Sequence, residues 1–219
     1  GWVYTHSCAE ILQEIALNLD FLSATLRDQP LRHHSLRATF AHSWALLAAP
    51  DAAVYRQLAL LRGGFTVETA SALTGAGQAS LARLVDKSLI QRSPGERYAI
   101  HELLRQYAVQ HLTPAEERRT LAAYCRYMAQ QMATWEEWRE TAREPEGLAA
   151  LEAEVENLRI AWGWLAEQLR QMNVNSSLRT SEQALRTAVD LLQLAAQLSS
   201  GVTYFFLRRS RYHEGQQWL

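Results

Sequence analysis

A histidine stands where an extended run of the sequence gives way to a helical one. His101 follows the extended run at 97–100 and precedes the helical pattern that begins at Glu102. The first amides of a helix have no partner inside the helix, and its dipole favours a nearby anion by about 0.3–1 kcal/mol. A phosphate group beside His101 would suit this position. The alternative is a histidine that caps the helix or lies on the surface.

Four basic side chains form a second set with possible chemistry, because cations on a helix and its neighbouring hairpin can contact nucleic-acid phosphates. The candidates for such contacts are Arg83, Lys87, Arg92 and Arg97. Alanine and serine occupy much of the remaining exposed face of this helix, so few side chains are left to read base edges. Charge and reach therefore favour an intramolecular or protein-contact role, with direct DNA binding as the alternative.

Other reactive residues do not combine into a recognisable site. No Ser/His/Asp or Cys/His set can be placed together, so we expect no catalysis by this chain. Three histidines, His33, His34 and His42, lack a cysteine or carboxylate at a metal-ligand spacing and are predicted to be surface residues. Cys8 and Cys125 are far apart and are expected to be thiols of a reducing compartment. No metal site is predicted.

Composition limits the partners of the chain. Its 22 basic and 23 acidic residues give a net charge of -1, which excludes a chain-wide field for nucleic acid or anionic lipid. No apolar run or leader pattern indicates a membrane span or a signal peptide, so a cytoplasmic protein without membrane contact is expected. Lys87 is the sole lysine, and no glycine-rich loop precedes it. A Walker A phosphate loop is therefore missing from this sequence.

The elements around these residues follow the order of a winged helix. We predict helices over 36–47, from Asp51 to Gly63-Gly64, at 66–74 and at 78–88, extended runs at 89–92 and 97–100 about a Ser-Pro-Gly-Glu turn, and a helix over 102–112. Helices followed by a small hairpin are typical of a winged-helix domain, in which the hairpin is the wing. We assign this domain to about residues 35–112.

The flanking segments are predicted to be helical. A capping-box pattern begins a helix over 8–26, and the part after Pro114 forms an α-helical array with expected segments 115–142, 147–170, 180–199, 202–209 and 212–219. Breaks are expected at Glu144-Pro145 and at Ser199-Ser-Gly201. The stretch 204–219 suggests one tetratricopeptide-like unit, and five tryptophans of the array are expected to pack between helices. The predicted fold class is mainly α, and the chain is expected to be part of a longer protein.

Several blocks of the sequence resemble successive landmarks of bacterial STAND regulators, signal-transduction ATPases with an NB-ARC-like, AAA+-related core. The blocks are Leu31 to Trp44, Leu61-Arg-Gly-Gly-Phe65, Leu81 to Leu89, Tyr98 to Ala108, Glu152 to Arg159 and Tyr212 to Leu219. The resemblance implies that residues 1–30 end the helical subdomain of that core. It also implies that residues 31–112 are its winged helix and that 113–219 lead into tetratricopeptide-like sensor repeats.

The same resemblance implies a role for the histidine. The family's winged helix carries a Met-His-Asp motif whose histidine contacts the β-phosphate of ADP, and Ile100-His101-Glu102 stands at that place here. The implied cofactors are ADP and ATP in the intact protein, with none for this fragment. The implied partners are an upstream nucleotide-binding domain, an inducer on the repeats, and further copies on activation. The expected function is an ADP-sensing latch, with a DNA-binding winged-helix transcriptional regulator as the alternative.

Overall fold

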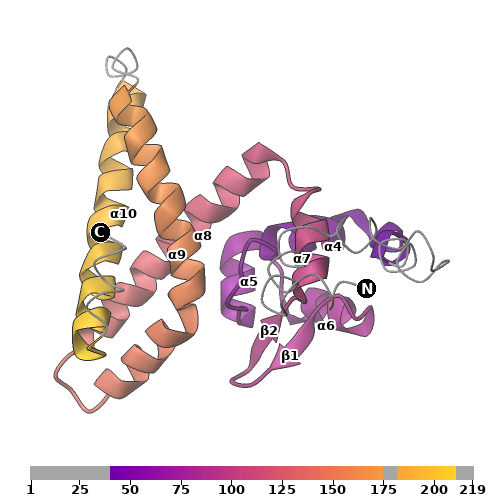
Figure 1. Ribbon diagram of the computed structural model, residues 1–219, viewed down its shortest axis with the longest axis horizontal. Helices are drawn as coiled ribbons and strands as arrows, with labels where there is room; N and C mark the ends of the chain where they lie inside the picture. The colour runs from indigo at the N-terminus through magenta and orange to yellow at the C-terminus, as the bar shows by residue number, and fades with distance from the viewer. Residues whose placement is uncertain (1–39, 175–181, 211–219) are drawn as a thin grey trace, which may run out of the picture.

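The computed structural model describes residues 40–174 and 182–210, which form a helical array joined to a winged-helix module (Figure 1). These residues are mainly helical and include one two-stranded antiparallel hairpin, so the predicted fold class is confirmed. The predictions for the helix over 8–26, for His33 and His34, and for the segment 212–219 lie outside the described residues. No described helix has the length and apolar character needed to cross a membrane.

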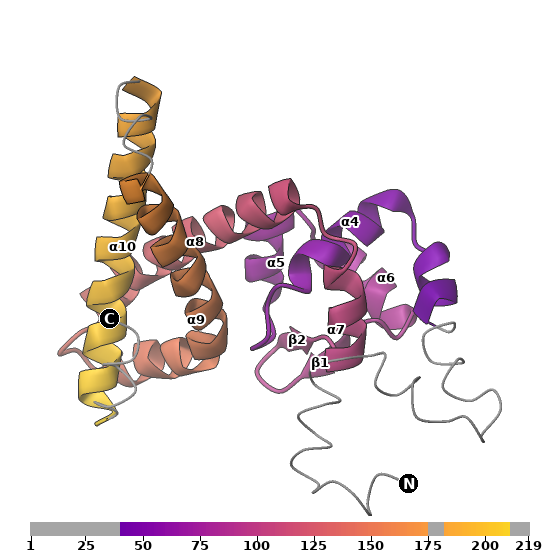
Figure 2. The same cartoon turned by 45° about the horizontal axis from the view of Figure 1, so that its top comes forward.

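The winged helix has the predicted order of elements (Figure 2). After a helical turn at 40–45, its elements are α4 (Ala49–Leu58), α5 (Val67–Thr74), α6 (Gln78–Asp86), β1 (Gln91–Ser93), β2 (Arg97–Ala99) and α7 (Glu102–Val109). Arg92 pairs with Tyr98 in the hairpin register. An isolated bridge from Phe65 to Tyr98 adds a third extended segment to the other edge of β2. This bridge holds the wing against the chain that enters α5.

Local side chains explain where these elements begin and end. The Thr66 hydroxyl accepts a hydrogen bond from the Thr69 amide at the start of α5, and Gly75 ends that helix with a φ of 73°. The helix predicted to begin at Asp51 begins two residues earlier, and Asp51 lies buried in the first turn of α4. Pro50 fits this first turn because its missing N–H would have no helical partner.

Gly64 is required by the close approach of two chain segments. Its φ is +73°, and a Cβ at this position would lie 2.6 Å from the carbonyl oxygen of Tyr98. Only glycine accepts that backbone conformation and that contact at low cost. The Gly63-Gly64 pair is predicted as a helix end, but α4 already ends at Leu58, and the pair instead allows the wing to pack against the loop before α5.

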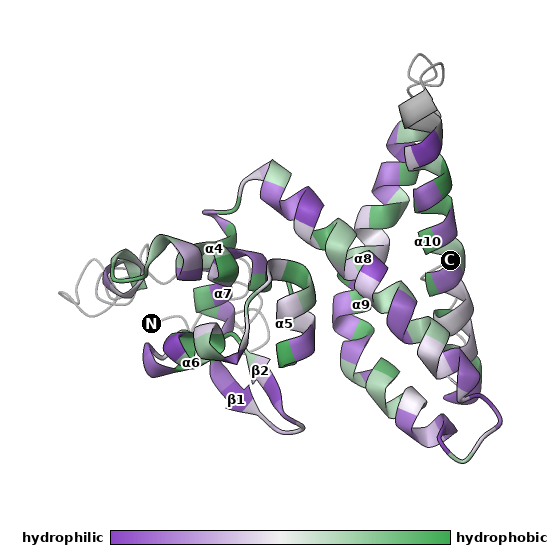
Figure 3. Ribbon diagram, turned by 180° about the vertical axis from the view of Figure 1, so that it is seen from behind, coloured by the Kyte–Doolittle hydropathy of each residue, from purple (hydrophilic) through white to green (hydrophobic). Residues whose placement is uncertain are grey.

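The core of the winged helix continues into the array. Tyr55, Leu58, Phe65, Leu81 and Leu84 are almost completely buried. The same cluster extends to the inner faces of the array helices, and α5 packs directly against α8. Figure 3 shows apolar residues on the helices of the winged helix and hydrophilic residues along most of the β1–β2 hairpin. The two parts are therefore packed together by a shared apolar interior.

Three long helices form the described array: α8 (Pro114–Glu137), α9 (Glu144–Val174) and α10 (Glu182–Arg208). Thr113 and Glu116 form a reciprocal capping box at the start of α8. The break predicted at Glu144-Pro145 instead coincides with the first turn of α9, where proline is tolerated.

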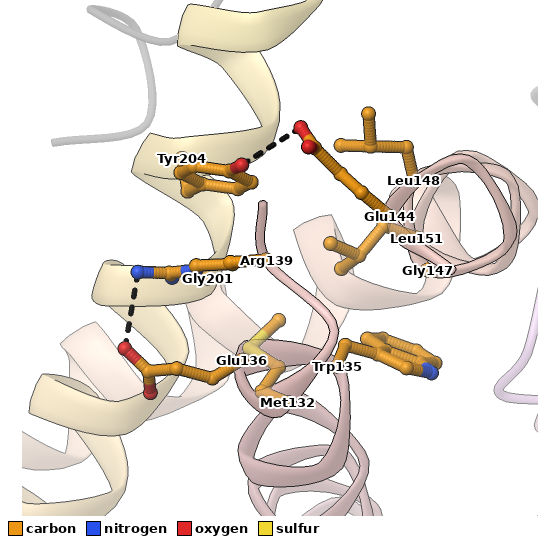
Figure 4. Close-up of a pocket in the computed structure, with 10 residues that line it drawn as sticks. All are labelled: Met132, Trp135, Glu136, Arg139, Glu144, Gly147, Leu148, Leu151, Gly201 and Tyr204. Atoms are coloured by element: carbon orange, nitrogen blue, oxygen red, sulfur yellow. Dashed lines mark hydrogen bonds and ion pairs between the residues drawn. The ribbon is translucent and has the colours of Figure 1, made fainter. Parts of the chain in front are cut away.

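The break predicted at 199–201 is absent, and α10 runs continuously through it. Figure 4 shows Gly201 of α10 beside Met132 of α8. A Cβ at Gly201 would lie 2.6 Å from the sulfur of Met132. A glycine inside a helix costs about 1 kcal/mol relative to alanine, and the close packing of α8 and α10 that it permits offsets this cost. The glycine serves a helix crossing rather than a turn.

The tryptophans of the array that the structure describes pack as predicted. Trp135, Trp162 and Trp164 are partly buried against the core cluster, and Trp138 lies beneath the guanidinium of Arg143 at 3.7 Å from its ring centroid. Trp218 lies outside the described residues. The expected tetratricopeptide-like unit is described only where 204–208 ends α10.

Candidate nucleic-acid interface

The helices α5 and α6 form the helix-turn-helix, and α6 and the wing carry three exposed cations. Arg83 and Lys87 are exposed at the end of α6, and Arg92 is exposed on β1. In a winged helix these two elements are the ones that approach DNA. The described structure therefore places three of the four predicted basic residues on the expected face.

Arg83 is held in place by a carboxylate of α4. Its Nε donates to Oδ2 of Asp51 at 2.8 Å, and its Nη2 donates to Oδ1 at 2.7 Å. The Arg83 guanidinium lowers the pKa of the Asp51 carboxyl, which stays ionised at neutral pH. The side chain of Arg83 remains 52% exposed, so its outer part can still meet a phosphate. The pair orients Arg83 but also neutralises part of its charge.

Arg92 lies beside a recess between the wing and the helix-turn-helix. The recess has a volume of about 350 Å³, and the Arg92 guanidinium lies 5.9 Å from the ring centroid of Tyr98. Glu68 and Glu96 line the same recess. A hydrogen bond from Thr66 is the main cause of a lowered pKa at Glu68, which therefore stays negative. The local charge at the wing is mixed, in agreement with the near-neutral composition.

Arg97 lies in a different place from the other three basic residues. Its Nη1 donates to Glu154 at 2.7 Å, and its Nη2 donates to the carbonyl oxygens of Gly63 at 3.1 Å and Gly64 at 3.0 Å. Its side chain is only 16% exposed. Arg97 thus connects the wing to α9, and we leave it out of the surface that faces solvent.

A buried polar cluster completes this connection. Asn157 is fully buried: its Oδ1 accepts from the Gly63 amide at 2.8 Å, and its Nδ2 donates to Gly64 and Glu154. The Tyr124 hydroxyl donates to Oε2 of Glu154 at 2.7 Å, the same oxygen that accepts from Asn157, while Oε1 accepts from Arg97. Burial, and then the Glu154 charge, raise the pKa of Tyr124, so this hydroxyl keeps its proton. Residues of α8, α9, the wing and the loop before α5 share one network.

Sequence reasoning missed this cluster, although a signal was present. The buried stripe of α9 runs through Leu151, Val155, Leu158 and Leu165. Glu154 and Asn157 interrupt that stripe at positions that a helical wheel places toward the core. Buried polar side chains are almost always hydrogen-bonded, so such interruptions indicate a structural network.

His101 caps the helix that follows it. It is the N-cap of α7, and its Nδ1 accepts a hydrogen bond from the Leu103 amide at 3.3 Å. Glu102 is bound by Arg105 through two hydrogen bonds of 2.7 and 2.6 Å, and this arginine is the main cause of the lowered pKa of Glu102. Ile100 packs against the core.

Metal and thiol chemistry have little support in the described part of the chain. No group of three or more potential metal ligands occurs among residues 40–174 and 182–210, and His42 is exposed. Cys125 is a free, buried cysteine, and burial raises the pKa of its thiol to about 12. This thiol is therefore protonated and poorly nucleophilic.

Comparison with known proteins finds regulators of transcription. The chain is 27% identical over 216 residues to three curated proteins described as "Putative HTH-type transcriptional regulator", one from Mycobacterium bovis and two from strains of Mycobacterium tuberculosis. The match covers 91% of this chain and 24% of each relative, so the chain spans about a quarter of their length. No protein-family model matches the chain, and no solved structure does so.

These comparisons correct the assignment to STAND regulators, which is wrong. The similarity is to HTH-type regulators, and none of the matches indicates an NB-ARC-like ATPase region. The contact of ADP with Ile100-His101-Glu102 came from that resemblance alone and loses its basis. Locally, the Nδ1 of His101 already accepts from the helix it caps, and the Glu102 carboxylate is already bound by Arg105.

Proposed function

We propose that the chain is a segment of a transcriptional regulator in which the winged helix contacts duplex DNA through α6 and the wing. The observation that carries the proposal is the placement of Arg83, Lys87 and Arg92, exposed on the two elements that a winged helix uses for DNA. The similarity to HTH-type regulators supports the same function. The chain would act by binding rather than by catalysis.

Phosphate contacts dominate the proposed interface. Ala79 and Ala82 are exposed on α6 and offer no hydrogen bond to a base edge. Three cations can position the module on the backbone of the duplex, while Asp86 and Glu96 on the same face limit their attraction. We therefore expect weak binding with little dependence on DNA sequence for this segment alone.

The salt dependence of binding measures the number of phosphates contacted. Each contact contributes a slope of about -0.9 to a plot of log K against log salt, so three contacts predict a slope of about -2.7. Binding of a fluorescent duplex to the purified chain would be followed by anisotropy in a salt series. Lys87→Gln and Arg92→Gln should each reduce the slope by about 0.9. Both residues are exposed, so neither change should disturb folding.

Arg83 needs a paired substitution, because removing it alone would leave Asp51 buried without a partner. The double change Arg83→Gln with Asp51→Asn removes the cation and keeps a neutral hydrogen-bonding pair. Arg143→Gln, at an exposed position between α8 and α9, is the matched control and should leave the slope unchanged. A chain that does not bind the duplex at low salt, or whose slope is insensitive to Lys87 and Arg92, would refute the proposed function.

A further inference from the structure

A large groove lies where the winged helix meets the array. It has a volume of about 970 Å³ and is walled by α8, α9 and α10, with Gln57 of α4 and Leu73 of α5 also contributing to its lining. Figure 1 shows α8 running from the winged helix, where it packs against α5, to the array, where it packs against α9 and α10. The groove is distinct from the face of α6 and the wing, since none of its lining residues belongs to those elements.

One wall of the groove is basic. Arg118, Arg119 and Arg126 of α8 line it, and none of them forms a salt bridge with a carboxylate among the described residues. Asp190 of α10 is the acidic residue of the lining. Cations that line a concavity without partners favour an occupant of opposite charge.

The rest of the lining mixes apolar side chains with glutamines and threonines. Leu191 and Leu194 of α10 and Trp164 of α9 line the groove opposite α8, and Ala122 and Ala123 lie between the arginines. An apolar lining of this kind is typical of a binding surface.

Trp164 adds an unsatisfied polar group to this wall. Its Nε1–H is buried and has no hydrogen-bond partner in the described structure. A buried donor without an acceptor costs about 1–3 kcal/mol, so native structures seldom retain one without a reason. An acceptor on an occupant could satisfy this donor after a small movement of the side chain.

We propose that this groove binds an acidic amphipathic helix of a partner protein. Arg119 and Arg126 are seven residues apart, which separates them by about 10.5 Å along α8 and places them on nearly the same face. A helix with carboxylates at heptad spacing on one side and leucine-like side chains on the other would match both walls. Duplex DNA has no apolar side chains that could pack against the wall formed by α9 and α10. A small ligand would leave much of so large a groove open.

A partner in this position would touch both parts of the molecule, because the lining combines α4 and α5 with the array. The proposal does not depend on DNA binding by the wing. Substitutions in the groove should leave the salt slope for DNA unchanged, and substitutions at Lys87 or Arg92 should leave peptide binding unchanged. The two proposals can therefore fail separately.

The test uses a small panel of labelled helical peptides with leucines on one face and glutamates at heptad spacing on the other. Each is titrated with the whole chain at physiological salt and compared with a scrambled peptide of the same composition. We expect saturable binding of at least one panel member with one peptide per chain, and at least tenfold weaker binding of its scrambled form. If no panel member binds, or scrambled forms bind equally well, the proposal is overturned.

Variants assign the binding to the groove. Arg119→Glu with Arg126→Glu should weaken binding at least tenfold, and replacing the glutamates of the peptide by lysines should restore it. Leu194→Ser tests the apolar wall and should also weaken binding. Arg143→Glu with Arg159→Glu reverses the same number of charges at exposed positions outside the groove and is the charge-matched control. Circular dichroism checks that each variant is folded. Equal losses in the control and the groove variant, or displacement of the peptide by duplex DNA, would show a non-specific basic surface and overturn the proposal.

Discussion

The buried amide of Asn157 gives the sharpest test of how the winged helix and the array are joined. Its Nδ2 donates to the Gly64 carbonyl at 2.8 Å and to Glu154 at 2.9 Å. Asn157→Asp replaces this nitrogen with an oxygen and changes the shape of the side chain very little. The new oxygen would face two acceptors, while the bond from the Gly63 amide at 2.8 Å could persist.

The expected loss of stability follows from these contacts. Two donated hydrogen bonds are worth about 1 kcal/mol each, and an additional buried carboxylate beside Glu154 adds the cost of an unpaired charge. We expect Asn157→Asp to lower the free energy of unfolding by about 3–5 kcal/mol at neutral pH. Asn157→Ala removes three bonds without adding charge and should cost about 3 kcal/mol.

The effect of Asn157→Asp should also depend on pH. The neighbouring Glu154 carboxylate and the burial of the site would raise the pKa of the new carboxyl in the folded state above its unfolded value. The folded state then binds more protons than the unfolded state as the pH falls through that range. The destabilisation should therefore shrink toward acidic pH, whereas that of Asn157→Ala should not change in this way.

Urea unfolding would measure these differences by circular dichroism and tryptophan fluorescence. In the parent chain the two signals should change together, because the parts share one core. Glu156→Gln, on the exposed face of the same turn of α9, is the control and should stay within about 0.5 kcal/mol of the parent. A cost below about 1 kcal/mol for Asn157→Asp at neutral pH would refute the argument, since the loss of two buried hydrogen bonds already exceeds it.

Two further predictions concern the array. Gly201→Leu should lower the free energy of unfolding by about 1–3 kcal/mol, because the leucine would overpack against Met132. In a double variant, Met132→Ala should recover part of this loss. Additive losses of the two changes in denaturant titrations would contradict this packing. Arg56 lowers the pKa of the Glu116 carboxyl to about 2, mainly through a hydrogen bond of 2.5 Å. The stability that this pair provides should be present above about pH 4.5 and lost as the pH falls toward 2. Glu116→Gln should therefore flatten the plot of unfolding free energy against pH in this range. An unchanged plot would argue against the pair.

The order of the elements in the winged helix was accessible from sequence because each signal is local. The Ser-Pro-Gly-Glu turn, with Gly95 at a φ of 75°, places the hairpin, and the residues flanking it supply the strands. Thr66 and Gly75 mark the ends of α5 by the capping rules. Short-range signals of this kind need no knowledge of distant contacts.

Features that depend on tertiary contacts could not be predicted from local sequence signals. The Ser199-Ser-Gly201 stretch predicts a helix break, and the contact with Met132 that explains the glycine lies far away in the sequence. Arg97 was placed with the other cations of the wing, although its partner Glu154 lies 57 residues further along the chain. A basic residue in a hairpin looks the same in sequence whether it faces solvent or a buried carboxylate. Only the packed structure distinguishes these cases.

The polar cluster at the base of the wing limits how this molecule can be recombined with related ones. Arg97 and Gly64 belong to one part of the chain, and Glu154 and Asn157 to the other. A chimera that takes its wing from one protein and its helical array from another would inherit half of a buried hydrogen-bonding set. All four residues would have to be transplanted together. Two proteins are therefore suitable for making such a chimera only if both carry these four residues.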